Sequence, residues 1–268
     1  MSWQHEERTP VIIAAFNEEK RIANTLAALD VENVAPLVMV NGSSDRTAEI
    51  ARQYTDQVIE LEEQGKFPAL QRGVEILGRQ GLHGVLFIDA DSVPRHRRIW
   101  ADEMTFPFIT NPGPMVTAGR LRFTEGSSVA NGIRTLRRQR DFAASARRQD
   151  SSSVYGANMG VQFHTEDIRD EFLALPHVWP GEDKLTADLI MEHGGKVKYL
   201  ASPYSDVHTS SRYHISLLER LVKGKRNAVT QNDAGYLARS PNAARASYVD
   251  GRIVPFLPKT SGVISPEA

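Results

Sequence analysis

GVLFIDAD, residues 84–91, is the stretch of this chain that decides its fold. Its first five residues are apolar and predict a buried strand over 84–88, and two carboxylates, Asp89 and Asp91, follow at once. The carboxyl ends of strands in an open α/β sheet border the crevice where ligands bind. Hard divalent cations prefer oxygen ligands and often join carboxylates to substrate phosphates. The pair is therefore a candidate metal and diphosphate site, against the alternative that acids at strand ends form turns or cap helices.

Apolar runs and helical patterns alternate on the N-terminal side of this stretch. Strands are predicted over 11–16, 37–40 and 58–61, and helices over 18–29, 68–79 and a segment that Ser44 or Asp45 caps and that continues to Tyr54. Strands that alternate with helices indicate an α/β fold with a doubly wound, mostly parallel sheet and right-handed crossovers.

The second half of the chain is less regular. Strands are predicted over 115–123, 161–163 and 196–200, and helices over 129–148, 183–193 and 214–233. The tail from Arg239 contains four prolines and is predicted to be irregular. We expect one domain over residues 1–235 and a C-terminal extension over 236–268.

Composition excludes several classes of protein. The 268 residues contain no cysteine, so disulfides, zinc–thiolate sites and thiol nucleophiles are excluded. The net charge of −1 gives no overall attraction for nucleic acid or membranes. No apolar run is long enough to span a membrane, and the polar start is unlike a secretory signal. A soluble, cytoplasmic protein is expected.

Seven short motifs follow one another along the chain. They are AAFNEE at 14–19, NGSSDRT at 41–47, GKFPAL at 65–70, DAD at 89–91, GANM at 156–159, GED at 181–183 and DVH at 206–208. This order resembles the family 2 glycosyltransferases, which have the GT-A fold, over about residues 10–210. The resemblance implies metal-dependent, inverting transfer of a sugar from a UDP-sugar or GDP-sugar to an acceptor hydroxyl. It also implies a nucleotide-sugar-binding half over 1–115 and an acceptor half over 116–235.

The resemblance places the donor at the strand ends. The donor-binding residues that it implies are Ala14, Phe16, Asn17, Glu18, Asn41, Lys66, Asp89, Ala90, Asp91, Asn158 and Arg212. Glu18 would accept from a ribose hydroxyl, and Asn158 would bond a sugar hydroxyl. Ordinary roles stay open: an acid near a helix start for Glu18, a solvated lysine at Lys66 and a turn at Asn158. The family usually has two adjacent acids where this chain has Val40 and Asn41, so the identity of the base is open.

The resemblance also implies the metal ligands and the catalytic base. Asp91 would bind the metal directly, Asp89 would contact metal or ribose, and His208 would be a further ligand. Oxygen ligands suit Mn²⁺ or Mg²⁺, and a histidine among them favours Mn²⁺. Asp183 would deprotonate the acceptor hydroxyl, with Glu182 orienting the acceptor or the base. The alternative is that both acids merely open a helix.

The acceptor and other partners are not named by the sequence. A glycan, a lipid-linked acceptor and a small molecule all stay open. The predicted helix over 129–148 is rich in arginine, which leaves a peripheral membrane contact open beside a solvated charged face. Two other functions also stay open, a sugar nucleotidyltransferase and a catalytically silent nucleotide-sugar binder. The first usually has a glycine-rich basic loop after its first strand, which residues 14–18 do not resemble.

Overall fold

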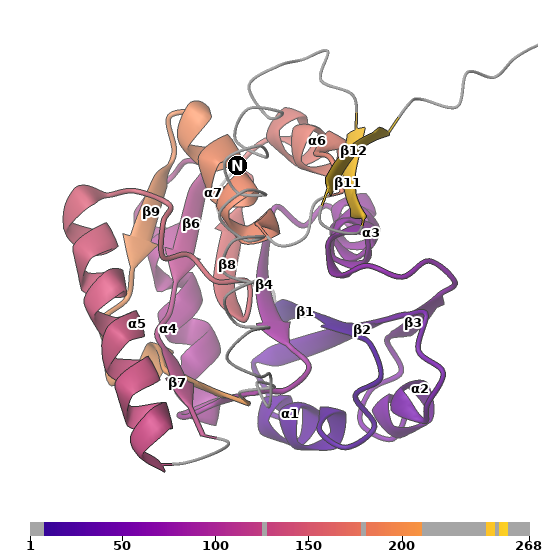
Figure 1. The fold of residues 1–268 in the computed structure, drawn as a ribbon. Coiled ribbons are helices and arrows are strands. Elements are labelled where there is room, and N and C mark those ends of the chain that lie inside the picture. The colour runs from indigo at the N-terminus through magenta and orange to yellow at the C-terminus, as the bar shows by residue number, and fades with distance from the viewer. Residues whose placement is uncertain (1–7, 125–127, 178–180, 211–244, 250–251, 257–268) are drawn as a thin grey trace, which may run out of the picture.

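A seven-stranded sheet forms the centre of the molecule (Figure 1). The computed structural model describes residues 8–124, 128–177, 181–210, 245–249 and 252–256. The strands lie in the order β3-β2-β1-β4-β8-β6-β9, and β8 alone runs antiparallel to its two neighbours, β4 and β6. Their bounds are β1 Thr9–Ala15, β2 Val34–Asn41, β3 Val58–Leu61, β4 Gly84–Asp89, β6 Met115–Ala118, β8 Asn158–Gln162 and β9 Lys196–Tyr199.

The register of the central strands brings the predicted motifs to one edge of the sheet. Ala14 of β1 pairs with Met39 of β2 on one side and with Asp89 of β4 on the other. Because these three strands are parallel, the loops that follow them emerge at the same edge. The sequence prediction of a mostly parallel α/β sheet is confirmed, and its edge is where a ligand crevice is expected.

Helices cover both faces of this sheet (Figure 1). Val11 and Ile13 of β1 pack towards one face and Ile12 towards the other, as strand alternation requires. The first face is covered by α1 Ile22–Leu29, α2 Thr47–Ala51 and α4 Arg97–Thr110. The second face is covered by α3 Lys66–Arg79, α5 Ser128–Arg148, α6 Glu166–Ala174 and α7 Glu182–Glu192.

A smaller sheet begins directly after the acidic pair. It consists of β5 Ser92–Pro94, β10 Val207–Thr209 and β7 Leu121–Phe123, with β10 in the middle. β10 runs antiparallel to β5 and parallel to β7. The 3₁₀ turn η1 Pro203–Ser205 leads into β10. A separate antiparallel pair joins β11 Arg245–Val249 to β12 Arg252–Phe256.

The single strand predicted over 115–123 is wrong, because the chain leaves the large sheet at Gly119. β6 ends before it and β7 begins after it, in a different sheet. A Cβ on Gly119 would lie 2.5 Å from the carbonyl oxygen of Ser205 and closer still to the amide of Asn158. Only glycine, which has no Cβ, fits between these two groups. The apolar pattern of residues 115–123 does not predict this break between two strands.

Other differences concern short or weakly patterned elements. The helices α4 and α6 and the three-residue strands β5 and β10 were not predicted. The prediction of an irregular tail is wrong for β11 and β12, which form an antiparallel strand pair. The helix predicted over 214–233 lies outside the described residues.

Candidate active site

The ends of β1 and β2 are joined by two asparagines. Asn41 is 4% exposed, and in the amide orientation that satisfies both neighbours it donates to the carbonyl of Ala15 (2.7 Å) and accepts from the N–H of Gly65 (3.2 Å). Asn17 has a φ of 52°, and its Oδ1 accepts from the backbone N–H of Ser44 at 2.9 Å. These bonds fix the loop geometry at the sheet edge. The ring of Phe16 next to them is exposed, as a base-contacting side chain would need to be.

Glu18 faces the protein interior. Its side chain is 1% exposed, its Oε2 pairs with Arg21 Nε at 3.0 Å, and its backbone N–H donates to Thr47 Oγ1 at 2.7 Å. The structure therefore does not present Glu18 to a ribose, contrary to the expectation. Ala90 is also buried, and its carbonyl accepts from Thr25 Oγ1 at 2.8 Å. Ala14 is partly buried at the strand tip.

Lys66 stands between the two acidic motifs. It is the first residue of α3, and its Nζ lies 2.6 Å from Asp89 Oδ1 and 3.5 Å from Glu182 Oε1. Burial by itself lowers the pKa of Lys66, but the charges of Asp89 and Glu182 raise it above its ordinary value. The solvated-lysine alternative is therefore wrong, because this ammonium group is paired on two sides.

Asp183 and Glu182 open helix α7 beside Lys66. The two oxygens of Asp183 accept from the N–H groups of Lys184 (2.8 Å) and Gly156 (3.3 Å), and Glu182 Oε2 accepts from Gly181 at 3.0 Å. Burial and the charge of Glu182 raise the pKa of Asp183 to about 7, although Lys66 acts to lower it. A carboxyl group with a pKa near neutrality is well matched to general base catalysis.

Asp91 is held by the start of the segment after β10. Its Oδ2 accepts from Ser210 Oγ at 2.6 Å, and its carbonyl accepts from the N–H of Ser210 at 3.2 Å. Burial, and then the charge of Asp89, raises the pKa of Asp91. Two nearby carboxylates that repel each other provide the hard oxygen donors that Mg²⁺ and Mn²⁺ prefer. The acidic pair therefore fits a divalent cation, whose charge would relieve the repulsion.

His208 lies on the same face of the small sheet as Asp91. The bonds from Arg95 N to Asp206 O and from Ser210 N to Asp91 O extend the β5–β10 ladder at both ends, and His208 pairs with Val93 between them. Residues two apart on a strand point to the same face, so the His208–Val93 pair is the next pair on that face after Ser210–Asp91. Burial lowers the pKa of His208. Among the described residues no three His, Cys, Asp or Glu side chains are grouped so that they could hold a metal ion, so His208 as a ligand stays a prediction.

Asn158 has a structural role in place of the predicted sugar contact. The side chain is fully buried, its Oδ1 accepts from Trp100 Nε1 at 3.0 Å, and its Nδ2 donates to the carbonyls of Ser205 (2.7 Å) and Arg120 (3.1 Å). Both amide hydrogens are used. The alternative that Asn158 holds a turn is therefore favoured. Arg212 lies outside the described residues.

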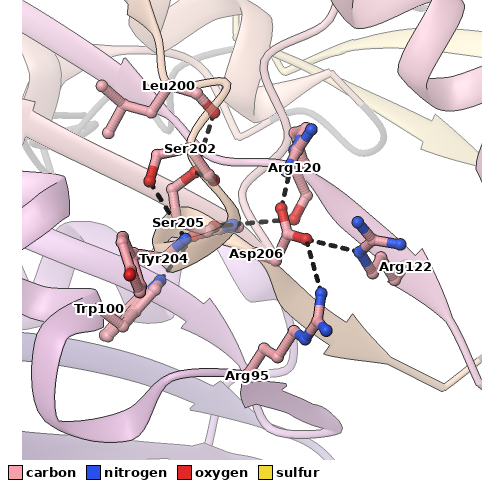
Figure 2. Close-up of polar contacts among 10 residues, drawn as sticks. Arg95, Trp100, Arg120, Arg122, Leu200, Ser202, Tyr204, Ser205 and Asp206 are labelled. Atoms are coloured by element: carbon pink, nitrogen blue, oxygen red, sulfur yellow. Dashed lines mark hydrogen bonds and ion pairs between the residues drawn. The ribbon is translucent and has the colours of Figure 1, made fainter.

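Sequence reasoning missed a group of arginines around Asp206 (Figure 2). The Asp206 carboxylate is 0% exposed; its Oδ1 lies 2.7 Å from Arg120 Nε and its Oδ2 lies 2.5 Å from Arg122 Nε. Arg95 Nη1 lies 3.8 Å from the same Oδ2. The signal in the sequence is the alternation of arginines 120 and 122, whose importance appears only once β7 and β10 are known to pair.

Two comparisons by sequence relate this chain to known proteins. Residues 11–162, more than half of the chain, match the model of glycosyl transferase family 2. A dolichyl-phosphate hexose transferase from Haloferax volcanii is 42% identical over 66 residues, which cover 24% of this chain and 29% of the relative. Glycosyltransferase AglE from the same organism is 28% identical over 186 residues, which cover 65% of this chain and 58% of that relative. The chain thus matches less than two thirds of the length of either relative.

Solved structures share the fold at low sequence identity. Glucosyl-3-phosphoglycerate synthase from Mycobacterium tuberculosis, in complex with Mn²⁺, UDP-glucose and phosphoglyceric acid, superimposes with a TM-score of 0.57 at 17% identity. The match covers 92% of this chain and 91% of that one. The same enzyme with Mn²⁺ and UDP-glucose gives a TM-score of 0.56, with 93% and 87% covered.

Proposed function

This chain belongs to glycosyltransferase family 2 and has the GT-A fold, and on that premise we propose that it transfers a sugar from a nucleoside diphosphate donor to an acceptor hydroxyl. The observation that carries the proposal is Lys66, whose ammonium group joins Asp89 of the predicted donor motif to Glu182 of the predicted acceptor motif. One cation in contact with both motifs supports their assignment to a single site.

In the proposed donor site, Asp89 and Asp91 would hold a divalent cation, Mn²⁺ or Mg²⁺. Such an ion, when bound, neutralises the two phosphates of the leaving group. Lys66, beside Asp89, adds a second positive charge against the diphosphate. Exposed Phe16 at the edge of β1 would contact the base. The M. tuberculosis neighbour that was crystallised with Mn²⁺ and UDP-glucose supports testing a UDP-sugar first.

In the proposed acceptor site, Asp183 would take the proton of the attacking hydroxyl. Its oxygens are oriented by two backbone N–H groups, and its pKa of about 7 leaves a large ionised fraction at neutral pH. The negative charge of Glu182 raises the pKa of Asp183, and Glu182 would also orient the acceptor. Direct displacement by the activated hydroxyl would invert the anomeric carbon, as the resemblance to family 2 implies.

A peripheral contact with a membrane is a second part of the proposal. None of the helices in the described part of the chain has both the length and the apolar character that a membrane crossing requires. Helix α5 exposes Val129, Ile133 and Leu136, which are spaced three and four residues apart and share one face. Exposed Arg137 borders this apolar face and exposed Arg140 continues it one turn beyond Leu136, a combination that suits an anionic lipid surface.

The donor site can be tested by measuring the melting temperature of the protein with a panel of nucleotides. UDP and GDP are each added with and without Mn²⁺, because a ligand that binds only the folded chain raises the melting temperature. We expect one nucleotide to raise it in the presence of Mn²⁺ and Asp91→Asn to remove the effect. Asp56→Asn, an exposed acid just before β3 and towards the opposite end of the paired strands from Asn41, is the matched control and should behave like the wild type.

The reaction product separates the alternatives. Release of a nucleoside diphosphate from a UDP-sugar or GDP-sugar supports sugar transfer. Release of pyrophosphate from a nucleoside triphosphate and a sugar 1-phosphate would indicate a nucleotidyltransferase. Nucleotide binding without turnover of any sugar donor, in the presence of Mn²⁺ and a range of acceptors, would indicate a silent binder.

A further inference from the structure

The arginines around Asp206 outnumber the charge that they neutralise (Figure 2). A buried carboxylate needs partners for its two oxygens, and Arg120 and Arg122 already supply one Nε each. Arg95 adds a third guanidinium at 3.8 Å. Three positive charges face one negative charge, which leaves an excess of two. Stabilising Asp206 alone does not require this excess.

Most of the hydrogen-bonding capacity of these arginines is unused. Arg120 and Arg122 contact Asp206 through Nε, and within the described residues their Nη groups have no hydrogen-bond partner in the protein. All three arginine side chains are partly exposed, with 21% exposure for Arg120, 33% for Arg122 and 44% for Arg95. Asp206 fixes two guanidinium groups through Nε, so their planar Nη ends are oriented in advance for an anion. Such ends match the geometry of a phosphate group.

This positive group lies on the same face of the small sheet as Asp91. The ladder pairs Asp91 with Ser210 at one end and Arg95 with Asp206 at the other, and Arg122 is level with His208 between them. At about 3.3 Å per residue, Arg122 lies roughly 7 Å and Arg95 roughly 13 Å along the strands from Asp91. The negative donor site and the positive group are therefore within the reach of one acceptor molecule.

We propose that Arg95, Arg120 and Arg122 form a subsite for a phosphate monoester carried by the acceptor. The proposal rests on the proposed sugar transfer and adds the chemical class of the acceptor to it. The phosphate binds to the free Nη groups, and the acceptor extends along the face towards Asp91, where its hydroxyl meets the donor. The phosphate belongs either to a soluble metabolite or to a lipid headgroup.

Two binding measurements on the full chain separate these sources. Isothermal titration with phenyl phosphate, without divalent metal, tests a soluble monoester. Cosedimentation with phosphatidylcholine vesicles that contain phosphatidic acid tests a lipid monoester, with pure phosphatidylcholine vesicles as the blank. Binding that depends on the arginines, in either assay or in both, supports the subsite. The assay in which it occurs shows whether the phosphate belongs to a soluble molecule or to a lipid.

Arg95→Gln and Arg122→Lys are the test variants. Arg95 makes only the long contact to Asp206, so its loss leaves the buried carboxylate paired, and Arg122→Lys keeps the charge while removing the planar end. Each should weaken phosphate binding about tenfold, as expected for one charge-assisted hydrogen bond. Arg97→Gln, an exposed neighbour at the start of α4, is the matched control and should bind like the wild type.

The outcomes separate this proposal from the proposed function. The shift in melting temperature given by nucleotide and Mn²⁺ is recorded for the same variants and should be unchanged. If that shift is present but phosphate binding is absent, or is equal in wild type, Arg95→Gln and Arg122→Lys, the subsite is refuted and sugar transfer is unaffected. If the arginines bind phosphate but no nucleotide raises the melting temperature, the donor proposal fails and the phosphate site remains.

Discussion

At the scale of single residues, the candidate site depends on one ammonium group among four carboxylates. Lys66 pairs with Asp89 and Glu182, and its charge also acts on Asp91 and Asp183. Without this cation, four negative charges would remain, three of them on partly buried carboxylates. Lys66 therefore offsets part of the negative charge of the donor and acceptor motifs before any ligand arrives.

The first prediction concerns the pH dependence of transfer. Asp183 must be ionised to act as a base, so the rate should rise with pH through about 7, the pKa of this carboxyl group. Because Lys66 lowers that pKa, Lys66→Met should move the rise to higher pH. Initial rates measured across pH for wild type and variant check this. A profile that is flat through neutrality would contradict the role of Asp183.

The second prediction concerns stability. The pKa of Asp183 is raised in the folded protein, so the folded state binds more protons than the unfolded state between about 4 and 7. The free energy of unfolding therefore loses this contribution as pH rises through that range. Asp183→Asn should gain stability relative to wild type as pH rises from about 4 to about 7, measured by denaturant unfolding at each pH. The same dependence on pH in wild type and in Asp183→Asn would contradict this prediction.

At the scale of elements, the break between β6 and β7 allows the arginines to reach Asp206. Gly119 leaves the large sheet, and its N–H donates to the carbonyl of Asn158 at 3.0 Å. The side chain of Asn158 then donates to the carbonyls of Arg120, just before β7, and of Ser205, just before β10. This buried asparagine thus holds together the two segments that carry Arg120 and Asp206.

The third prediction tests this junction. Gly119→Ala should lower the free energy of unfolding by about 1–3 kcal/mol, because its Cβ would collide with the carbonyl of Ser205 and the amide of Asn158. Gly132→Ala is the control: it lies in helix α5 with open space around it, and it should stabilise the protein by about 0.5–1 kcal/mol. Equal effects of the two changes in a denaturant titration would show that the junction is not tightly packed.

The fourth prediction concerns the exposed face of helix α5. Leu136 is 67% exposed, so Leu136→Glu should leave the free energy of unfolding nearly unchanged. It should reduce cosedimentation with anionic vesicles, because a carboxylate is repelled by the lipid surface and resists burial in it. Phe106→Glu on helix α4, 62% exposed, serves as the control. A loss for Phe106→Glu alone would assign any membrane contact to α4.

At the scale of the whole molecule, one sheet crosses both halves of the chain. β8 from the second half lies between β4 and β6 and pairs with each in register. The cores on the two faces of the sheet likewise contain residues from both halves. Neither half retains its share of the core if the other unfolds.

The fifth prediction follows from this shared sheet. The nucleotide-binding and acceptor halves should unfold together, in one cooperative transition with the same midpoint by circular dichroism and by tryptophan fluorescence. Trp100, fully buried in α4 against the sheet, reports on the packing of the first half against Asn158 of the second. Two separate transitions would show that the halves are independent domains.

The sequence by itself determined the α/β fold, its family and the order of its motifs. Apolar runs and helical spacing are local properties, so β3 was placed at its observed bounds and α5 within one residue of its start. The acidic pair at the end of β4 was recognisable for the same reason.

Only the tertiary structure decided which of the motif residues are available to a ligand. Asn158 and Glu18 lie in motifs typical of donor sites, yet burial and internal hydrogen bonds turn both side chains towards the protein. Lys66 and the arginines at Asp206 gain their importance from partners far away in the sequence. Such contacts depend on strand order and register, which bring distant residues together, and no local pattern encodes them.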